Sequence, residues 1–178
     1  FLLVCALAIG LLLSMAGCSN RHLEREYPPT GNMASVNGVR LHYTDIGSGP
    51  AIVLIHGAST SLRDFEPSLL KPLARHFRVI SVDRPGHGYS ERSQGPWPEP
   101  AEQATMIHEL LLALNVDQAI VLGHSWAGSV VLAYLLEYPE HARGGILLAG
   151  VTHPWKGGGE WYQELAGVPV LGPLFAWT

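Results

Sequence analysis

The chain has 178 residues, a formal net charge of −4 and a sequence pI near 6.1. This length suits one domain of ordinary size, and the acidic balance offers none of the basic surface that nucleic-acid binding requires. Both cysteines, Cys5 and Cys18, lie within the first 18 residues, which excludes a disulfide framework and a cysteine metal site from the folded part. No other segment shows metal-ligand spacing, so we expect neither a metal nor an organic cofactor.

An uncharged, largely apolar stretch occupies residues 1–17 and runs into Cys18. An apolar core followed by small residues is typical of a secretory signal, and this one is shorter than the ~20 residues that span a bilayer comfortably. The ending Ala16-Gly17-Cys18 resembles the lipobox of bacterial lipoproteins, with Met15 where Leu is usual. The resemblance implies lipidation of Cys18, export, and anchoring in the membrane of the bacterial cell envelope, with the outer membrane as one destination. A plain cleaved signal peptide and an uncleaved single-span anchor are the alternatives.

Residues 18–33 are polar, contain paired prolines, and are expected to form a tether. Across residues 34–152 the sequence changes to short apolar or β-branched segments separated by Gly and Pro. The predicted strands are a hairpin over 35–46 that turns at Asn37-Gly38, followed by 51–55, 78–83, 117–122 and 144–149. The predicted helices cover 65–76, 102–114 and 126–138. Strands that alternate with helices predict an α/β fold, with a mostly parallel sheet and helices on both faces.

Ser125 stands at the end of one predicted strand, with a predicted helix directly behind it. The segment from Leu122 to Gly128, LGHSWAG, resembles the G-x-S-x-G nucleophile elbow of the α/β-hydrolase superfamily, with Ala127 in place of the last glycine. The resemblance implies that Ser125 is the catalytic nucleophile, raised above the sheet on a sharp turn. By itself G-x-S-x-A is a weak pattern, and an ordinary helix-capping serine is the alternative.

A second segment, His56-Gly57-Ala58, follows an apolar strand, where the same superfamily has its His-Gly oxyanion segment. The resemblance implies that the backbone N–H groups of Ala58 and Trp126 form the oxyanion hole, which would hold the tetrahedral intermediate. It also implies that His56 orients this loop and takes no direct part in the chemistry.

The third segment, from Asp83 to Ser90, follows the next strand and resembles the D-x-x-G-x-G-x-S loop of the superfamily. That loop is built from tight turns. It precedes Ser125, whereas the superfamily order is Ser, then acid, then His, so we expect Asp83 and His87 to be structural. The three segments occur in the superfamily's order, and the resemblance covers residues 34–152.

The partners of the expected nucleophile are missing from this stretch of sequence. After Ser125 there is no Asp and there are only two histidines, His141 and His153, of which His153 lies at the strand-end edge and could face the pocket. In the superfamily the base follows the last strand, so we expect the triad acid and His beyond Thr178. We expect residues 153–178 to begin a lid, and the chain to be a fragment that lacks the last strands and is inactive by itself.

Taken together, the resemblances imply a serine hydrolase that acts by acyl transfer on a small-molecule substrate, most often a carboxylic ester or a related carbonyl compound. Serine at the elbow argues against epoxide hydrolases and haloalkane dehalogenases, which share the fold but attack through a carboxylate. A cofactor-free haloperoxidase and a carbon–carbon hydrolase on the same fold are alternatives. A non-catalytic lipoprotein that keeps the fold as a binding module is another. An Asp followed by a His at strand-end loops downstream would favour the enzyme over the binding module.

Overall fold

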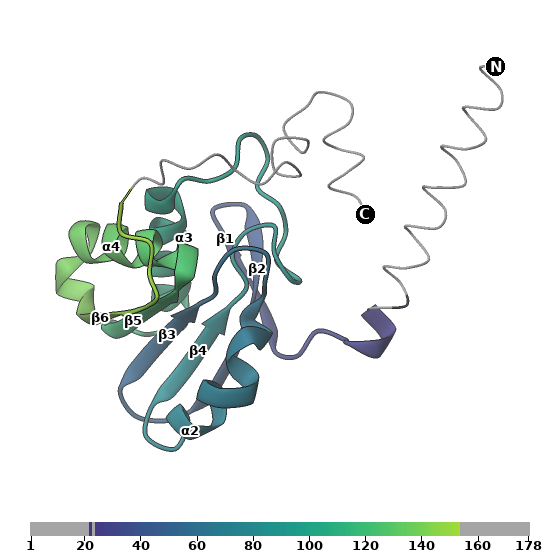
Figure 1. Cartoon of the computed structure of the whole chain (residues 1–178), viewed down its shortest axis with the longest axis horizontal. Coiled ribbons are helices and arrows are strands. Elements are labelled where there is room, and N and C mark those ends of the chain that lie inside the picture. Colours follow the sequence, from purple (N-terminus) through teal and green to yellow (C-terminus); the bar gives the residue numbers. More distant parts are fainter. Residues whose placement is uncertain (1–21, 23, 154–178) are drawn as a thin grey trace. The chain divides into compact units, whose positions relative to one another are not determined.

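The computed structural model describes residue 22 and residues 24–153, and those from Thr30 onward belong to one compact unit. Its core is a six-stranded sheet with the order β1-β2-β4-β3-β5-β6 (Figure 1). The strands are β1 (Asn32–Val36), β2 (Val39–Gly47), β3 (Ala51–Ile55), β4 (Arg78–Val82), β5 (Ala119–His124) and β6 (Ala142–Leu148). β2 pairs antiparallel with β1 and with β4, and the remaining pairs are parallel. The predicted fold class, a mostly parallel α/β sheet, is confirmed.

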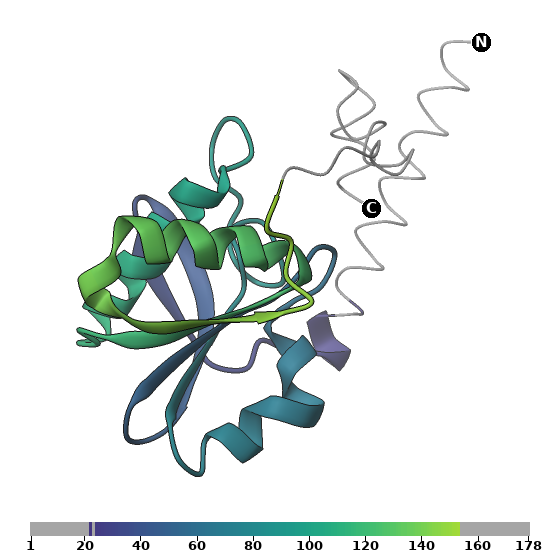
Figure 2. The same ribbon diagram turned by 60° about the vertical axis from the view of Figure 1, so that its left-hand side comes forward.

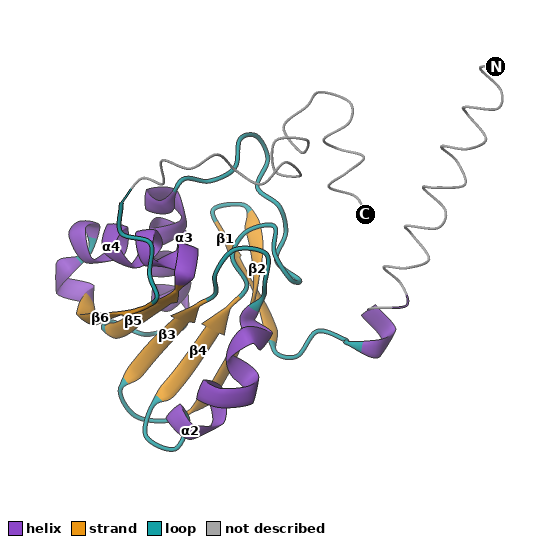
Figure 3. Cartoon of the chain, in the orientation of Figure 1, coloured by secondary structure: helices purple, strands orange, loops and turns teal. Residues whose placement is uncertain are grey.

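Helices cover both faces of this sheet (Figures 2 and 3). On one face lie α3 (Pro100–Ala113) and α4 (Gly128–Glu137), and on the other lies a run of short helices, η1 (Leu62–Phe65), η2 (Glu66–Leu70) and α2 (Lys71–Leu73). Two single helical turns, η3 (Ser125–Ala127) and η4 (Pro139–His141), lie on either side of α4 along the chain. The helices on the two faces explain why the central strands read as continuous apolar runs, since neither face of those strands meets water.

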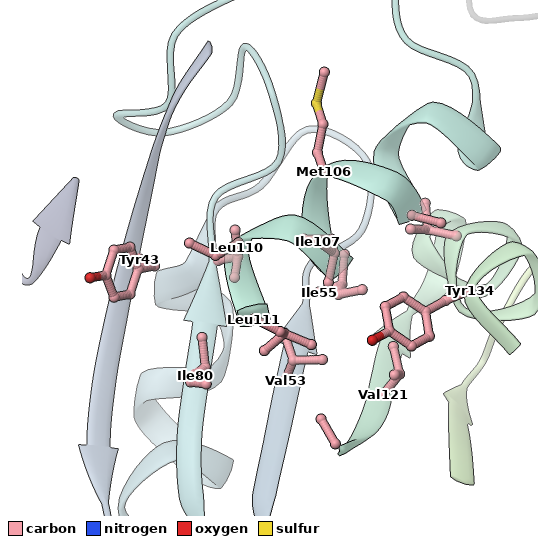
Figure 4. Packing of buried hydrophobic residues seen from close by; sticks show 14 of the residues in the cluster. Tyr43, Val53, Ile55, Ile80, Met106, Ile107, Leu110, Leu111, Val121 and Tyr134 are labelled. Atoms are coloured by element: carbon pink, nitrogen blue, oxygen red, sulfur yellow. The ribbon is translucent and has the colours of Figure 1, made fainter. Parts of the chain in front are cut away.

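Alternate residues of one strand supply two separate cores. Val53 and Ile55 of β3 pack with the α3 and α4 side chains, as Figure 4 shows, and both are fully buried. Ile52 and Leu54 of the same strand point the other way, toward Phe65 and the short helices. Because successive strand residues face opposite sides, one apolar pentapeptide serves both layers and fixes β3 at the centre of the sheet.

The segment between β3 and β4 differs from the single helix expected over 65–76. It is a 3-10 turn, a π-helical turn and a short α-helical turn in succession. Pro67 and Pro72 explain the difference, because proline has no N–H to donate to the helical ladder and its ring crowds the preceding turn. Its apolar side chains still pack on the sheet as expected, with Leu70 buried and Leu73 partly buried.

Candidate active site

The loops that follow β3 and β5 leave the sheet side by side. The two strands are parallel neighbours in register, with Ile55 opposite Gly123. Residues 56–58 and 124–126 therefore emerge at the same carboxyl edge of the sheet, where α/β proteins carry their sites. A Cβ atom placed on Gly57 would lie 3.1 Å from the Cβ of Ser125. The structure thus brings the expected nucleophile into contact with the expected oxyanion segment.

Ser125 has a backbone φ of 51°, in the left-handed region that side-chain-bearing residues rarely adopt. It follows directly on β5 and begins η3, which leads into α4, so the chain reverses sharply at this residue, and the serine is half-buried. A peptide from beyond β6 holds the turn, because the Val151 N–H donates to the Ser125 carbonyl at 2.9 Å. A strained backbone at a strand end is the geometry that a nucleophile elbow requires.

Glycines flank this turn for steric reasons that the structure makes explicit. A Cβ on Gly123 would lie 2.7 Å from the Ala127 carbonyl oxygen, and a Cβ on Gly128 would lie 2.7 Å from the Cα of Gly150. Ala127 is fully buried, so an alanine fits the position where the superfamily pattern has its last glycine. The departure from G-x-S-x-G is therefore compatible with the turn, and the second close approach is met by Gly128 one residue later.

His56 is fully buried, and both of its ring nitrogens are engaged. Nδ1 lies 2.9 Å from the Gly57 carbonyl oxygen, and Nε2 accepts the backbone N–H of Arg84 at 3.0 Å. Burial, and after it the nearby Arg84 cation, lowers the pKa of His56 to about 3. The imidazole is therefore neutral and donates from Nδ1. It has no nitrogen left to act as a general base, and it orients the loop as expected.

Asp83 holds together the loop that follows β4. Its carboxylate is 1% exposed and accepts the N–H groups of Leu62 at 2.7 Å and Tyr89 at 2.9 Å, and it lies 2.8 Å from Nδ1 of His42. Ser90 fastens the far end of the loop, donating to the Asp83 carbonyl at 2.7 Å. Because the Asp83 carboxylate is buried and both of its oxygens are engaged by these groups, we assign it a structural role in this loop.

Two further groups join the site that the sequence patterns did not single out. His124, next to the expected nucleophile, lies with Nδ1 3.1 Å from Asp64 Oδ2 in η1, so a half-exposed hydrogen bond connects the elbow to the segment after β3. Arg84 is 3% exposed and donates to the carbonyl oxygens of His56 and Gly57 in the expected oxyanion segment. Its only sequence signal was its place beside Asp83 in a turn-rich loop, and a charged residue in such a loop is usually on the surface.

Within residue 22 and residues 24–153, no group of three or more His, Cys, Asp or Glu is placed to hold a metal ion. No helix in the same part of the chain is long and apolar enough to cross a membrane. The expected lipidation site, Cys18, and the expected lid over 153–178 lie outside the described residues, apart from the exposed His153.

A serine on a sharp strand-to-helix turn, beside a glycine loop on a mostly parallel sheet, defines a protein of the α/β-hydrolase class. Residues 50–170 match the family model described as alpha/beta hydrolase fold. The chain belongs to this family.

Relatives within the family carry several names. A soluble epoxide hydrolase from Corynebacterium sp. is 36% identical over 105 residues, which cover 59% of this chain and 36% of the relative. The solved structure of an epoxide hydrolase without ligand is 31% identical with a TM-score of 0.67, covering 74% of this chain and 46% of that one. The crystal structure of an esterase from Rhodococcus sp. is 31% identical with a TM-score of 0.65, covering 72% and 48%. The chain spans less than half the length of the curated relatives it matches.

Proposed function

We propose that this protein is a serine hydrolase that transfers an acyl group from a carboxylic ester to water. The Oγ of Ser125 attacks the carbonyl carbon, and the backbone N–H groups of Ala58 and Trp126 hold the oxygen that becomes negative. A histidine base takes the serine proton and returns it to the departing alcohol, leaving an acyl ester on Ser125. Water then attacks that ester and releases the acid. The base and its acid partner come from sequence downstream of Thr178 in this proposal.

One observation carries the proposal: Ser125 has a φ of 51° at a strand end. At this point a Cβ added to Gly57 would lie 3.1 Å from the Cβ of Ser125. A helix-capping serine needs extended backbone and gains nothing from this conformation. Backbone strain of this kind clusters at functional sites, where the surrounding structure holds it in place. Relatives include both epoxide hydrolases and an esterase, and serine at the elbow favours the esterase, because an epoxide hydrolase attacks through a carboxylate.

A fluorophosphonate probe tests the nucleophile in the protein that includes the downstream region. We expect covalent labelling of the wild type and its loss in Ser125→Ala, because the phosphonyl group bonds to the serine oxygen. Ser68→Ala is the matched control, since Ser68 is an exposed serine of η2 on the other side of the same domain. Labelling that persists in Ser125→Ala would contradict the assignment, and an unlabelled wild type would favour the non-catalytic binding module.

We further propose that Cys18 carries a lipid that anchors the protein in the cell envelope. The support is the small-residue ending that precedes this cysteine. Metabolic labelling with a fatty-acid analogue tests it: incorporation is expected in the wild type and in Cys5→Ser, and is expected to vanish in Cys18→Ser. Membrane association that is unchanged in Cys18→Ser would instead favour an uncleaved apolar anchor.

A further inference from the structure

Arg84 is a buried cation whose partners are all neutral. It is 3% exposed, and no carboxylate among the described residues forms an ion pair with it. Its NH1 donates to the side-chain oxygen of Gln103 at 3.3 Å, and its NH2 lies 3.2 Å from Nε2 of His87. Burial lowers the pKa of Arg84 to about 10, so the guanidinium is charged at neutral pH. A buried charge without a counter-charge is costly, which calls for a reason to keep it.

The remaining donors of this guanidinium point at the oxyanion segment. Nε donates to the His56 carbonyl at 3.0 Å, and NH2 donates to the Gly57 carbonyl at 2.8 Å. The Gly57 carbonyl also receives Nδ1–H of His56 at 2.9 Å, so two donors hold this one oxygen. That carbonyl belongs to the same peptide unit as the N–H of Ala58. The group that fixes the carbonyl therefore fixes the direction of the N–H on the opposite side of the peptide bond.

Arg84 also touches the second half of the oxyanion hole. Its guanidinium carbon lies 4.5 Å from the ring centroid of Trp126, within the range of a cation–π contact. Trp126 supplies the other N–H of the proposed hole. One side chain from the loop after β4 thus contacts the Gly57–Ala58 peptide, which carries one proposed donor, and Trp126, which carries the other. These two groups come from the loops after β3 and β5.

We propose that Arg84 is a positioning residue of the oxyanion hole, which clamps the Gly57–Ala58 peptide and strengthens its N–H as a donor. This inference rests on the proposed function. The clamp prevents the exposed Ala58 peptide from rotating its N–H away from the substrate. A carbonyl that accepts from a cation is polarised, and hydrogen bonds in a chain strengthen one another, so the N–H across the peptide becomes a better donor. Preorganised donors of this kind stabilise the transition state more than the bound substrate.

Steady-state hydrolysis of p-nitrophenyl acetate by the protein with its downstream region tests the clamp in Arg84→Met. We expect kcat per active site to fall roughly 10- to 100-fold, while KM stays within about twofold of the wild-type value. This loss should not exceed the loss caused by deleting an oxyanion donor itself. The active-site concentration is counted by fluorophosphonate labelling, so partial unfolding does not mimic a loss of rate. Affinity for a phenylboronic acid, which becomes tetrahedral on the serine, is expected to fall by a similar factor.

Arg78→Met is the matched control, because Arg78 starts the same strand, β4, that Arg84 follows, and it forms an ion pair with Asp45 at 2.6 Å. This variant is expected to keep the wild-type kcat even if it unfolds at lower urea. If Arg84→Met gives no folded protein, Arg84→Lys provides the test instead. Lysine keeps a charge but cannot reach both carbonyls, so we expect kcat to fall about tenfold.

The outcomes separate this inference from the proposed function. A labelled wild type together with Arg84 variants whose kcat lies within about twofold of it would overturn only the role of Arg84. A fall confined to KM, with kcat and boronate affinity unchanged, would overturn it as well. A wild type that the fluorophosphonate does not label would overturn the proposed function, and the inference about Arg84 with it.

Discussion

At the scale of single residues, the conformation of Ser125 is held by its surroundings. A left-handed backbone costs a residue with a side chain about 1–2 kcal/mol, and the N–H of Val151, donated to the Ser125 carbonyl at 2.9 Å, offsets part of that cost. The rest follows from close packing. Gly123 lets β5 approach the start of α4, and Gly128 lets α4 approach the chain after β6. The turn therefore depends on the smallness of its neighbours as much as on Ser125.

The sharpest test of that dependence is Gly123→Ala. The added Cβ would lie 2.7 Å from the Ala127 carbonyl oxygen and 2.6 Å from Cγ2 of Val131, and the carbonyl is backbone that cannot rotate aside. We expect a loss of about 1–3 kcal/mol in the free energy of unfolding, measured by urea denaturation. Gly144→Ala in β6 is the control, because nothing lies within 4 Å of its added Cβ. Equal urea midpoints for the two variants would show that the turn tolerates the methyl group.

At the scale of elements, the loop after β4 links parts that are distant in sequence. Asp83 joins it to β2 through His42 and to η1 through the Leu62 N–H. In the same loop, the backbone N–H of Arg84 donates a hydrogen bond to Nε2 of His56. These buried contacts connect the loops after β3 and β4 to each other, so the proposed oxyanion segment, residues 56–58, is held in place by the rest of the fold. The turn-rich segment from Asp83 to Ser90 thus supports the neighbouring loop after β3.

The strands could be predicted from the sequence because their signals are local. The apolar run 51–55 coincides with β3, and the expected strand 78–83 matches β4 to within one residue. The helix boundaries shifted where backbone chemistry overrides periodicity. The prolines at 67 and 72 divide one expected helix into three turns. One strand also differs from its expected bounds: the strand expected over 117–122 is β5, which ends later, at His124. There β5 stops only when Ser125 turns into the left-handed region.

At the scale of the whole molecule, the family and the fold were predictable from three short segments, because their order along the chain reports their positions on the sheet. The buried network around Arg84 was not predictable. Nothing in the spacing of Asp83, Arg84 and His87 indicates that the middle side chain turns inward beneath another loop. Such contacts arise from the parallel register of β3, β4 and β5, which brings three carboxyl ends to one edge. The roles of Ser125 and its proposed oxyanion donors remain predictions.

His56, which is buried, and His87, which is partly buried, make the stability of the whole domain depend on pH. Burial, then Arg84, lowers the pKa of His56 to about 3, against about 6.5 in the unfolded chain. Between these values the unfolded chain binds the extra proton, so the contribution is fully present above about pH 6.5 and is lost as pH falls toward 3, by up to about 1.4 kcal/mol per pH unit. Burial and the nearby Arg84 also lower the pKa of His87, which acts in the same direction.

Urea unfolding between about pH 7.5 and pH 5 measures how steeply the free energy of unfolding depends on pH. We expect this slope to flatten in His56→Gln and to persist in His76→Gln, a control at an exposed position. An unchanged slope in His56→Gln would mean that His56 is not held neutral, and the orientation of the oxyanion loop would then need another cause.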